Sequence, residues 1–508
     1  MKKQSRVTGV AISYITTIVR TLSKLLLTPI YLKVLGLDDY GFYQYVFSVA
    51  SYAAILDFGI SSVVNTFSIK HREKGDVKGV ENVMFYALMF SVGATVLIVI
   101  GGFAVIIGAP AIFGEAVAHR IVLTRQLLII IITELILLMF QHYFEGTILA
   151  AEKYVTLRGV ALIQIVIRCV VTVLLLYTNV GVLSIALGDF IGIALCLAFE
   201  IYYCIAKLKL RIKYHYRDID LIKSIAKLSL ALCLQSIVSY LNSSIDKYVL
   251  GRYLGTVAAA IYSVAITFST FFDEIPTVIQ RLYLPQVVKL VASGADGEEL
   301  TSFVIKPGRY QFMLVGGVLG AFILFGRQFI AMWSGEDTLD AWKIALLLMI
   351  PSVLPLIQNV CLSILTAMNK RMFRSYVLCG IAIANLFMTI FLVKRFGLIG
   401  APIGTFIALI LGNNIAMNWY YKYKIGINVK RLFMSILKGI LPCAIVGTCI
   451  CIPLLFVPFK GIIWFFVECI VFCIIYAALL WFFGMNVEEK QRVGGAVKRI
   501  LRRDKSFE

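Results

Sequence analysis

Residues 82–107 read NVMFYALMFSVGATVLIVIGGFAVII and contain no charged side chain. A transmembrane helix needs roughly 20 consecutive, mainly apolar residues, so this stretch alone is long enough to cross a bilayer. The rest of the 508-residue chain is similar, because 60% of all residues are hydrophobic and only 15% are charged. Soluble domains are typically about half apolar and a quarter charged. The sequence therefore predicts an all-α polytopic membrane protein.

Apolar windows of this kind predict fourteen transmembrane helices. Their approximate limits are 8–34, 40–68, 81–107, 122–146, 152–177, 181–205, 222–250, 256–282, 307–332, 341–367, 373–394, 398–421, 432–456 and 461–485. The amino terminus lacks the short apolar core and the cleavage site of a signal peptide, and it is expected to remain attached as the first span.

The distribution of basic residues predicts how these helices are oriented. With the amino terminus in the cytoplasm, the cytoplasmic segments hold about 33 of the 48 Lys and Arg residues. The opposite loops hold only Arg120, Arg252, Lys394, Arg395 and Lys460. Because Lys and Arg accumulate in cytoplasmic loops, we expect both termini in the cytoplasm and the protein in the cytoplasmic membrane of a bacterium or archaeon.

The net charge of +20 is then mainly an orientation signal, and its natural partners are anionic membrane lipids. Nucleic acid is not an expected partner. No nucleotide is expected either, because the sequence lacks the phosphate-binding pattern G-x-x-x-x-G-K-[ST]. The eleven cysteines lie in apolar runs and form no metal-ligand spacing with the four histidines, so we expect free thiols and no metal site.

A weak internal repeat recurs at an offset of about 216 to 219 residues. Leu35-Gly36 aligns with Leu254-Gly255, Ile148-Leu-x-Ala151 with Ile364-Leu-x-Ala367, and Gly181 with Gly397. These matches predict two pseudo-symmetric lobes of six helices in parallel orientation, with the substrate path where the two repeats meet. The predicted parts are an N-lobe at 1–205, a basic cytoplasmic loop at 206–221, a C-lobe at 222–425, helices 13 and 14 at 426–485, and a basic cytoplasmic tail at 486–508.

Polar residues within the predicted spans are the candidates for function. On the first helix, Arg20 and Lys24 share one face with several hydroxyl groups. Each basic residue at a helix centre costs about 2.5 to 3.5 kcal/mol on insertion scales, so the pair is expected to face a water-filled cavity. With Arg168 they would suit a phosphate group. The further cavity or coupling candidates are Asp57, Glu134, Gln164, Asp189, Gln235, Asn242, Asp246, Lys247, Asp273 and Glu274. A purely structural role, as ion pairs and interhelical hydrogen bonds, is the alternative.

Several motifs resemble the multidrug/oligosaccharidyl-lipid/polysaccharide (MOP) exporter superfamily, and specifically the polysaccharide flippases of the Wzx type. They are residues 23–36 (SKLLLTPIYLKVLG), 40–43 (YGFY), 56–59 (LDFG), 150–153 (AAEK) and 397–404 (GLIGAPIG). The resemblance implies a MATE-like pair of lobes that moves an undecaprenyl-diphosphate-linked oligosaccharide to the outer leaflet by alternating access. It implies that Arg20, Lys24 and Arg168 serve a cationic cavity, and that the polysaccharide polymerase machinery is a candidate partner.

Other functions remain open at this point. Within the same fold, the alternatives are a flippase for the peptidoglycan lipid precursor and a cation-coupled multidrug exporter. The exporter is disfavoured because its cationic substrates would not suit central arginines. An enzyme is not expected, because the longest predicted outer loop, 109–121, is short. No cofactor is expected, and energy would come from an H+ or Na+ gradient, the membrane potential or the substrate gradient.

Overall fold

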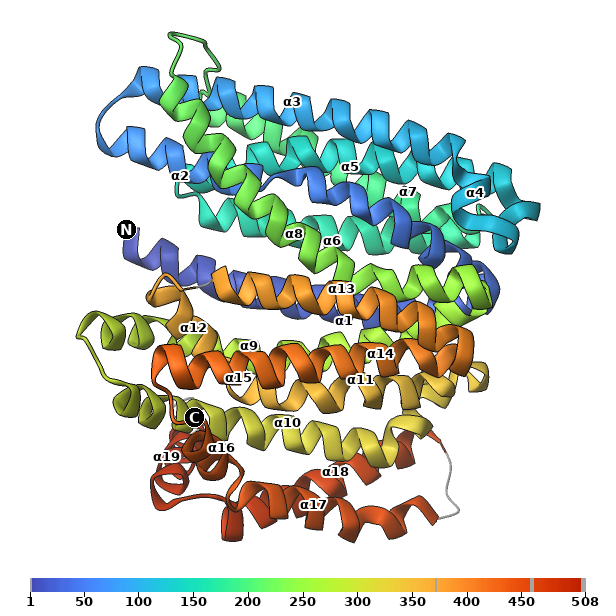
Figure 1. The fold of residues 1–508 in the computed structure, drawn as a ribbon, viewed down its shortest axis with the longest axis vertical. Helices are drawn as coiled ribbons and strands as arrows, with labels where there is room; N and C mark the ends of the chain where they lie inside the picture. The colour runs from blue at the N-terminus through green and yellow to red at the C-terminus, as the bar shows by residue number, and fades with distance from the viewer. Residues whose placement is uncertain (1, 371, 457–460, 504–508) are drawn as a thin grey trace. The chain divides into compact units, whose positions relative to one another are not determined.

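The computed structural model describes residues 2–370, 372–456 and 461–503, and this part of the chain is built from helices joined by turns and short loops (Figure 1). The helices of the first half are α1 (Lys2–Ala50), α2 (Ile60–Glu73), α3 (Val77–Ile107), α4 (Ala109–Phe113), α5 (Ile121–Ala150), α6 (Tyr154–Tyr177) and α7 (Leu183–Tyr202). Those of the second half are α8 (Ile219–Leu254), α9 (Thr256–Ala292), α10 (Gly297–Ser334), α11 (Asp340–Ile357), α12 (Val360–Ala367), α13 (Met372–Phe396), α14 (Gly400–Leu409) and α15 (Met417–Tyr420). They are followed by α16 (Val429–Leu437), α17 (Ile440–Cys451), α18 (Ile462–Leu479) and α19 (Val487–Arg503).

Eleven helical stretches within the described residues are long and apolar enough to cross a membrane. Two of them, Ile15–Glu73 and Met372–Ile425, are 59 and 54 residues long. Since one crossing takes roughly 20 to 25 residues, each of these can cross twice. Helix α8, with 36 residues, is a further long helix outside that set. The all-α polytopic membrane fold is therefore confirmed, and the fourteen predicted spans are consistent with it.

The chain packs into two compact units, each with its own core. The first unit comprises Met1–Val264 and Leu386–Ala401, and the second comprises Ala265–Asn385 and Pro402–Glu508. Aromatic side chains such as Phe42, Tyr45 and Tyr143 are fully buried in the first unit. Figure 1 shows its helices α3, α5 and α7 running side by side. The units differ from the predicted sequence lobes, because α8 packs on α1 within the first unit. The lobe boundaries stay a prediction.

The backbone repeats the pattern that the sequence offset predicts. Gly36 (φ 82, ψ 171) and Gly255 (φ 91, ψ 177) adopt the same conformation, in a region that is almost restricted to glycine. Residues with positive φ recur along the chain at an offset of about 216 to 221. The pairs are Gly36 and Gly255, Gly75 and Gly294, Gly114 and Gly335, Glu152 and Asn369, Gly181 and Gly397, and Lys209 and Gly426. The two halves therefore share their turns, although few side chains match.

Three predicted spans are interrupted in the structure. The span at 40–68 is interrupted between α1 and α2, where a 3-10 helix at Ser51–Asp57 is followed by Phe58 and Gly59 with positive φ. The span at 341–367 is divided at Gln358 and Asn359, between α11 and α12. The span at 432–456 starts later than predicted, since Lys438 and Gly439 separate the short α16 from α17. Hydropathy averaged over a long window does not report such breaks, because one or two residues with an unusual backbone conformation barely change the average.

Candidate functional site

Helix α1 has two exposed faces of opposite character. Ile18 and Leu22 are 57% and 46% exposed on one face. At about 100° per residue, Arg20 and Lys24 lie roughly on the opposite side, and both are exposed. A helix between lipid and a water-lined space is expected to have one apolar and one polar exposed face. The geometry of α1 within the first unit agrees with that arrangement.

The two cations of α1 have different neighbours. Arg20 interacts electrostatically with Glu145 of α5, which also interacts with Arg158 of α6. Lys24 interacts with a second cation, Lys247 of α8. Two like charges at close range favour an anion near them.

Lys247 is held by a chain of polar side chains. Its Nζ donates a hydrogen bond to Oε1 of Gln44 at 3.1 Å. Nε2 of Gln44 in turn donates to the hydroxyl of Tyr40 at 3.0 Å. The Lys24–Lys247 pair therefore lies beside neutral side chains that can accept and donate hydrogen bonds.

Arg168 of α6 has an acidic partner within the bundle. Its Nε lies 2.8 Å from Oδ1 of Asp189 on α7, and the two side chains are 32% and 17% exposed. Glu134 of α5 interacts electrostatically with both of them, and Tyr31 of α1 does the same. Three predicted candidates, Arg168, Asp189 and Glu134, are therefore brought together around one ion pair.

The structure does not bring the three predicted cations to one point. Arg168 adjoins Tyr31, which lies roughly 16 Å from Arg20 and roughly 10 Å from Lys24 along the axis of α1. The cations thus form a column at different depths. A column suits an extended ligand with separated anionic and polar groups better than a single compact phosphate.

A second polar cluster extends from Asp57, at the end of the 3-10 helix between α1 and α2, to helices α5, α6 and α7. Oδ1 of Asp57 lies 2.8 Å from Nδ1 of His142 on α5. Nε2 of Gln141 donates to Oε1 of Gln164 on α6 at 3.0 Å and more weakly to Oε1 of Glu200 on α7 at 3.4 Å. His142 also interacts electrostatically with Glu200. The cluster therefore joins two predicted candidates, Asp57 and Gln164, to three residues that the sequence analysis missed, Gln141, His142 and Glu200.

One of the missed residues, His142, could have been found in the sequence together with Glu145. His142 and Glu145 are three positions apart and share a face of α5, and Glu145 interacts with His142. Hydropathy alone hides this face, because α5 is apolar over most of its length. A search for titratable residues at helical spacing within apolar windows would have found it.

Other predicted candidates occupy more closed positions. Asp246 is 2% exposed and accepts hydrogen bonds from the hydroxyls of Tyr262 and Thr389, the latter at 2.9 Å. In the second unit, Asp273 interacts with Glu274, and Oδ1 of Asp273 has no hydrogen-bond partner among the described residues. The side chains of Gln235 and Asn242 lie outside the part of the chain that the structure describes. Packing thus supports a structural role for Asp246.

Comparison with known sequences identifies similar proteins. The model of the family described as "Polysaccharide biosynthesis protein" matches residues 7–291. A curated protein of Shigella flexneri, the "Putative O-antigen transporter", is 22% identical over 187 residues. That match covers 37% of this chain and 44% of the length of the Shigella protein. The matched family region includes Arg20, Lys24, Arg168 and the cluster around Asp57.

Comparison with solved structures finds the same fold in membrane transporters. The inward closed conformation of the lipid II flippase MurJ is 14% identical with a TM-score of 0.72, covering 93% of this chain and 98% of that one. An inward-facing multidrug resistance MATE family transporter of the MOP superfamily is 15% identical with a TM-score of 0.68, covering 80% and 96%. At such identities the similarity establishes the MOP fold alone.

Proposed function

Because this chain belongs to the polysaccharide biosynthesis protein family, we propose that it is a flippase for undecaprenyl-diphosphate-linked oligosaccharides. It would move repeat units of a surface polysaccharide, such as O-antigen, capsule or exopolysaccharide, across the cytoplasmic membrane by alternating access. Its amino and carboxyl termini would lie in the cytoplasm, and polymerase machinery would receive the product. The likeness to a putative O-antigen transporter supports this substrate class.

One observation carries the proposal: α1 exposes Arg20 and Lys24 on the face opposite its exposed apolar side chains. A diphosphate accepts charge-assisted hydrogen bonds from such cations. In this proposal Arg20 and the Lys24–Lys247 pair would bind the diphosphate. Arg168, already paired with Asp189, would lie further along the path. The neutral tyrosine and amide groups beside it suit the hydroxyl groups of sugars.

The proposal is tested by transport of a fluorescent lipid-linked oligosaccharide in proteoliposomes. Arg20→Ala and Lys24→Ala should each reduce transport by about tenfold or more, the effect of losing a hydrogen bond to a charged group. Lys33→Ala is the matched control, because Lys33 is exposed on α1 but lies roughly on its apolar face. Full transport by the double variant Arg20→Ala/Lys24→Ala would overturn the assignment of the cavity.

The same assay separates the alternatives within this fold. A peptidoglycan precursor flippase would transport the lipid-linked disaccharide in preference to the oligosaccharide. A cation-coupled multidrug exporter would expel ethidium, and Arg20→Ala would not impair it. The cations exposed on α1 favour the anionic lipid over a cationic drug. No step of the proposal requires the making or breaking of a covalent bond.

We also propose that Asp57 and His142 respond to the coupling ion, whether H+ or Na+. Their side chains are 28% and 27% exposed, and they meet where the 3-10 helix Ser51–Asp57 ends at the break between α1 and α2. In proteoliposomes with an imposed pH or Na+ gradient, Asp57→Asn should abolish the dependence of flux on one gradient. Gln44→Ala, at a polar site away from this cluster, should retain that dependence. A full response to both gradients in Asp57→Asn would contradict the proposal.

A further inference from the structure

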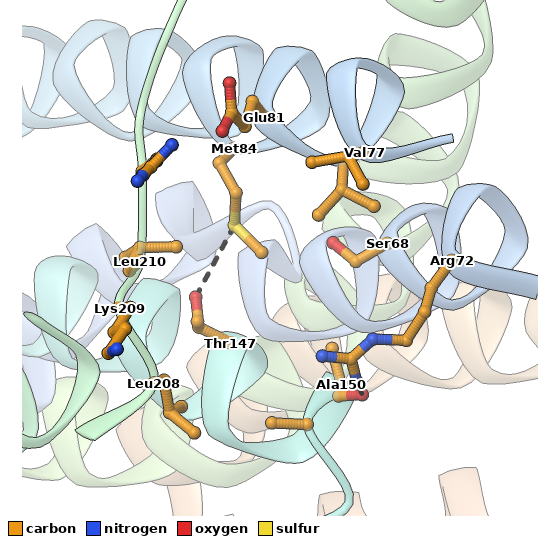
Figure 2. Close-up of a pocket in the computed structure, with 13 residues that line it drawn as sticks. Ser68, Arg72, Val77, Glu81, Met84, Thr147, Ala150, Leu208, Lys209 and Leu210 are labelled. Carbon is orange, nitrogen blue, oxygen red and sulfur yellow. Dashed lines mark hydrogen bonds between the residues drawn. The ribbon is translucent and has the colours of Figure 1, made fainter. Parts of the chain in front are cut away.

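A pocket of about 340 Å³ lies in the first unit beside the basic loop at 206–221. It is lined by α2, by α3, by the end of α5 and by the loop that follows α7 (Figure 2). Pockets that bind small molecules have volumes of roughly 300 to 1,000 Å³. This pocket is separate from the Arg20, Lys24 and Arg168 column, so it belongs to no site described above.

The charges that line the pocket are mainly positive. Arg72, Lys209 and Arg211 contribute three cations, against the single carboxylate of Glu81. That carboxylate is already paired with His215. An anion entering the pocket would therefore meet three cations and a carboxylate that already has a partner.

Hydrogen bonds fix the loop backbone beside Lys209 and the side chain of Arg72. Lys209 has a positive φ of 51°, and the residues on either side of it, Leu208 and Leu210, donate backbone hydrogen bonds to Tyr203 and Cys204 at 3.1 and 3.0 Å. Arg72 donates from Nη1 to the carbonyl of Ala150 at 2.8 Å. The guanidinium of Arg72 is therefore fixed before a ligand binds, and it loses less conformational freedom on binding than the exposed side chains of Lys209 and Arg211.

The floor of the pocket contains an unused polar group. Ser68 is 3% exposed, yet its hydroxyl has no hydrogen-bond partner among the described residues. Figure 2 shows this hydroxyl directed into the pocket. The neighbouring Thr147 hydroxyl already donates to Tyr143 and Met84. A buried hydroxyl without a partner is costly, and a ligand oxygen would satisfy it.

The remaining walls are apolar. Val77, Val80 and Met84 come from α3, and Leu208 and Leu210 come from the basic loop. Val77 is 69% exposed at the rim, so the apolar wall continues to the surface. A free inorganic anion makes no use of such walls, whereas a molecule with a phosphate and a hydrocarbon part uses both.

We propose that this pocket binds the phosphate of an anionic phospholipid, with Arg72, Lys209 and Arg211 on the phosphate oxygens and the Ser68 hydroxyl donating to one of them. The lipid's apolar part then lies along Val77, Val80 and Leu210. This site goes beyond the proposed transport function, and its failure would leave that function untouched.

The test uses the full-length, delipidated protein in detergent with three probes: dioctanoyl phosphatidylglycerol, dioctanoyl phosphatidylcholine and inorganic phosphate. Binding is measured by the rise in unfolding temperature and by native mass spectrometry of retained lipid. Phosphatidylglycerol should bind, and phosphatidylcholine should bind at least about tenfold more weakly, because its headgroup has no net charge. Inorganic phosphate that binds as tightly as phosphatidylglycerol would overturn the phospholipid assignment.

Two double variants with equal charge change isolate the pocket. Lys209→Gln/Arg211→Gln removes two lining cations and should weaken phosphatidylglycerol binding by about tenfold or more. Lys207→Gln/Lys213→Gln removes two cations of the same loop that do not line the pocket, and affinity should stay within about twofold. Equal losses in both variants would show diffuse attraction to the loop and would overturn the proposal.

A third variant does not depend on the integrity of the loop. Ser68→Ala removes a hydroxyl that has no partner in the described protein, so the lipid-free unfolding temperature should not fall. Affinity for phosphatidylglycerol should fall about fivefold, the effect of one lost hydrogen bond. Unchanged affinity in Ser68→Ala would remove the hydroxyl from the site and contradict the proposed binding mode.

Discussion

The segment α1–α2 and its repeat counterpart α8–α9 share a backbone plan but differ in chemistry. Both contain a glycine with the same unusual conformation, Gly36 in one and Gly255 in the other. At the offset of about 219, Arg20 and Lys24 correspond to Ser239 and Ser243. The α-helix of the first segment is also interrupted at Ser51–Gly59, whereas α9 remains α-helical through its whole length.

A second contrast concerns one pair of side chains that joins two helices in each half. Arg168 and Asp189 form an ion pair in the first unit. In the second unit, Thr405, at the repeat position of Asp189, donates a hydrogen bond to Oδ1 of Asn385 at 3.1 Å. The same interhelical position is thus charged in one half and neutral in the other. The repeat preserves turns because backbone geometry requires them, and it leaves side chains free to diverge.

The largest effect on stability should come from the buried charge of the second unit. Arg309 of α10 is bound by both carboxylate oxygens of Glu489 on α19, at 2.6 and 3.1 Å, and both side chains are almost fully buried. Arg309 also donates to the carbonyls of Ser435, Lys438 and Gly484. It therefore joins helices beyond the repeat to α10.

Glu489→Gln leaves the Arg309 charge buried with a weaker partner. We expect a loss of about 3 kcal/mol, visible as a lower unfolding temperature in detergent, with little change in substrate affinity. Glu488→Gln is the control, because Glu488 is exposed and its partners Lys306 and Arg492 are exposed or half-buried. Loss of substrate affinity without loss of stability would contradict the structural role of Arg309. The second unit would then, like the first, use a cation for function.

The next largest effect should come from converting the charged pair of the first unit into the neutral pair of the second. Asp189→Thr leaves Arg168 without its nearest carboxylate and should cost about 2 kcal/mol, discounted because Arg168 is partly exposed. The double variant Arg168→Asn/Asp189→Thr should recover most of that stability but not transport. Thermal unfolding in detergent measures the stability, and flux in proteoliposomes measures the transport. A double variant that transports normally would show the ion pair to be structural.

The fold was largely predictable from the sequence, because long apolar windows and the bias of Lys and Arg depend on composition. The turns at Gly36, Gly181, Gly255 and Gly397 were also visible as repeated glycines. The break at Phe58 was not, because a phenylalanine with positive φ has no compositional signature.

The site was less predictable, because side-chain partners depend on packing between helices distant in sequence. Arg168 with Asp189, and Asp57 with His142, are each joined across two helices. Spacing along one helix placed Arg20 and Lys24 on one face. It could not place Arg168 at the depth of Tyr31, which requires the relative height of α1 and α6.

The glycines that the halves share should respond equally to substitution. A Cβ at Gly36 or Gly255 meets no atom within 4 Å, so alanine there costs only backbone strain, about 1 to 2 kcal/mol. Gly36→Ala and Gly255→Ala should therefore lower the unfolding temperature by similar amounts. Gly101→Ala is the control, since Gly101 lies within helix α3 with open space around it and should not destabilise. Unequal losses of stability in Gly36→Ala and Gly255→Ala would show that the two turns share their conformation but not its energetic importance.

The smallest effect concerns the capping carboxylates that follow the shared turns at Gly75 and Gly294. Asp76 accepts a hydrogen bond from the backbone N–H of Gly79 at 2.8 Å, and Asp296 accepts one from that of Glu299 at 2.7 Å. Of these two aspartates, Asp76 alone has a histidine partner in the described structure, His71 at 2.9 Å. The Gly79 N–H first, and then His71, hold the pKa of Asp76 below its ordinary value of 3.8.

Asp76→Asn keeps the cap but loses the charge, so we expect a fall of roughly 1 °C in unfolding temperature at pH 7. A depressed pKa stabilises the fold fully above the unfolded value of 3.8, and this stabilisation disappears as pH falls through the folded pKa. The difference between wild type and Asp76→Asn should therefore shrink below about pH 4. Asp296→Asn, which loses a cap carboxylate without a histidine partner, should show a smaller difference at pH 7. A difference for Asp76→Asn that grows below about pH 4 would contradict this origin of its stability, because protonation of the carboxylate should make the aspartate resemble the asparagine.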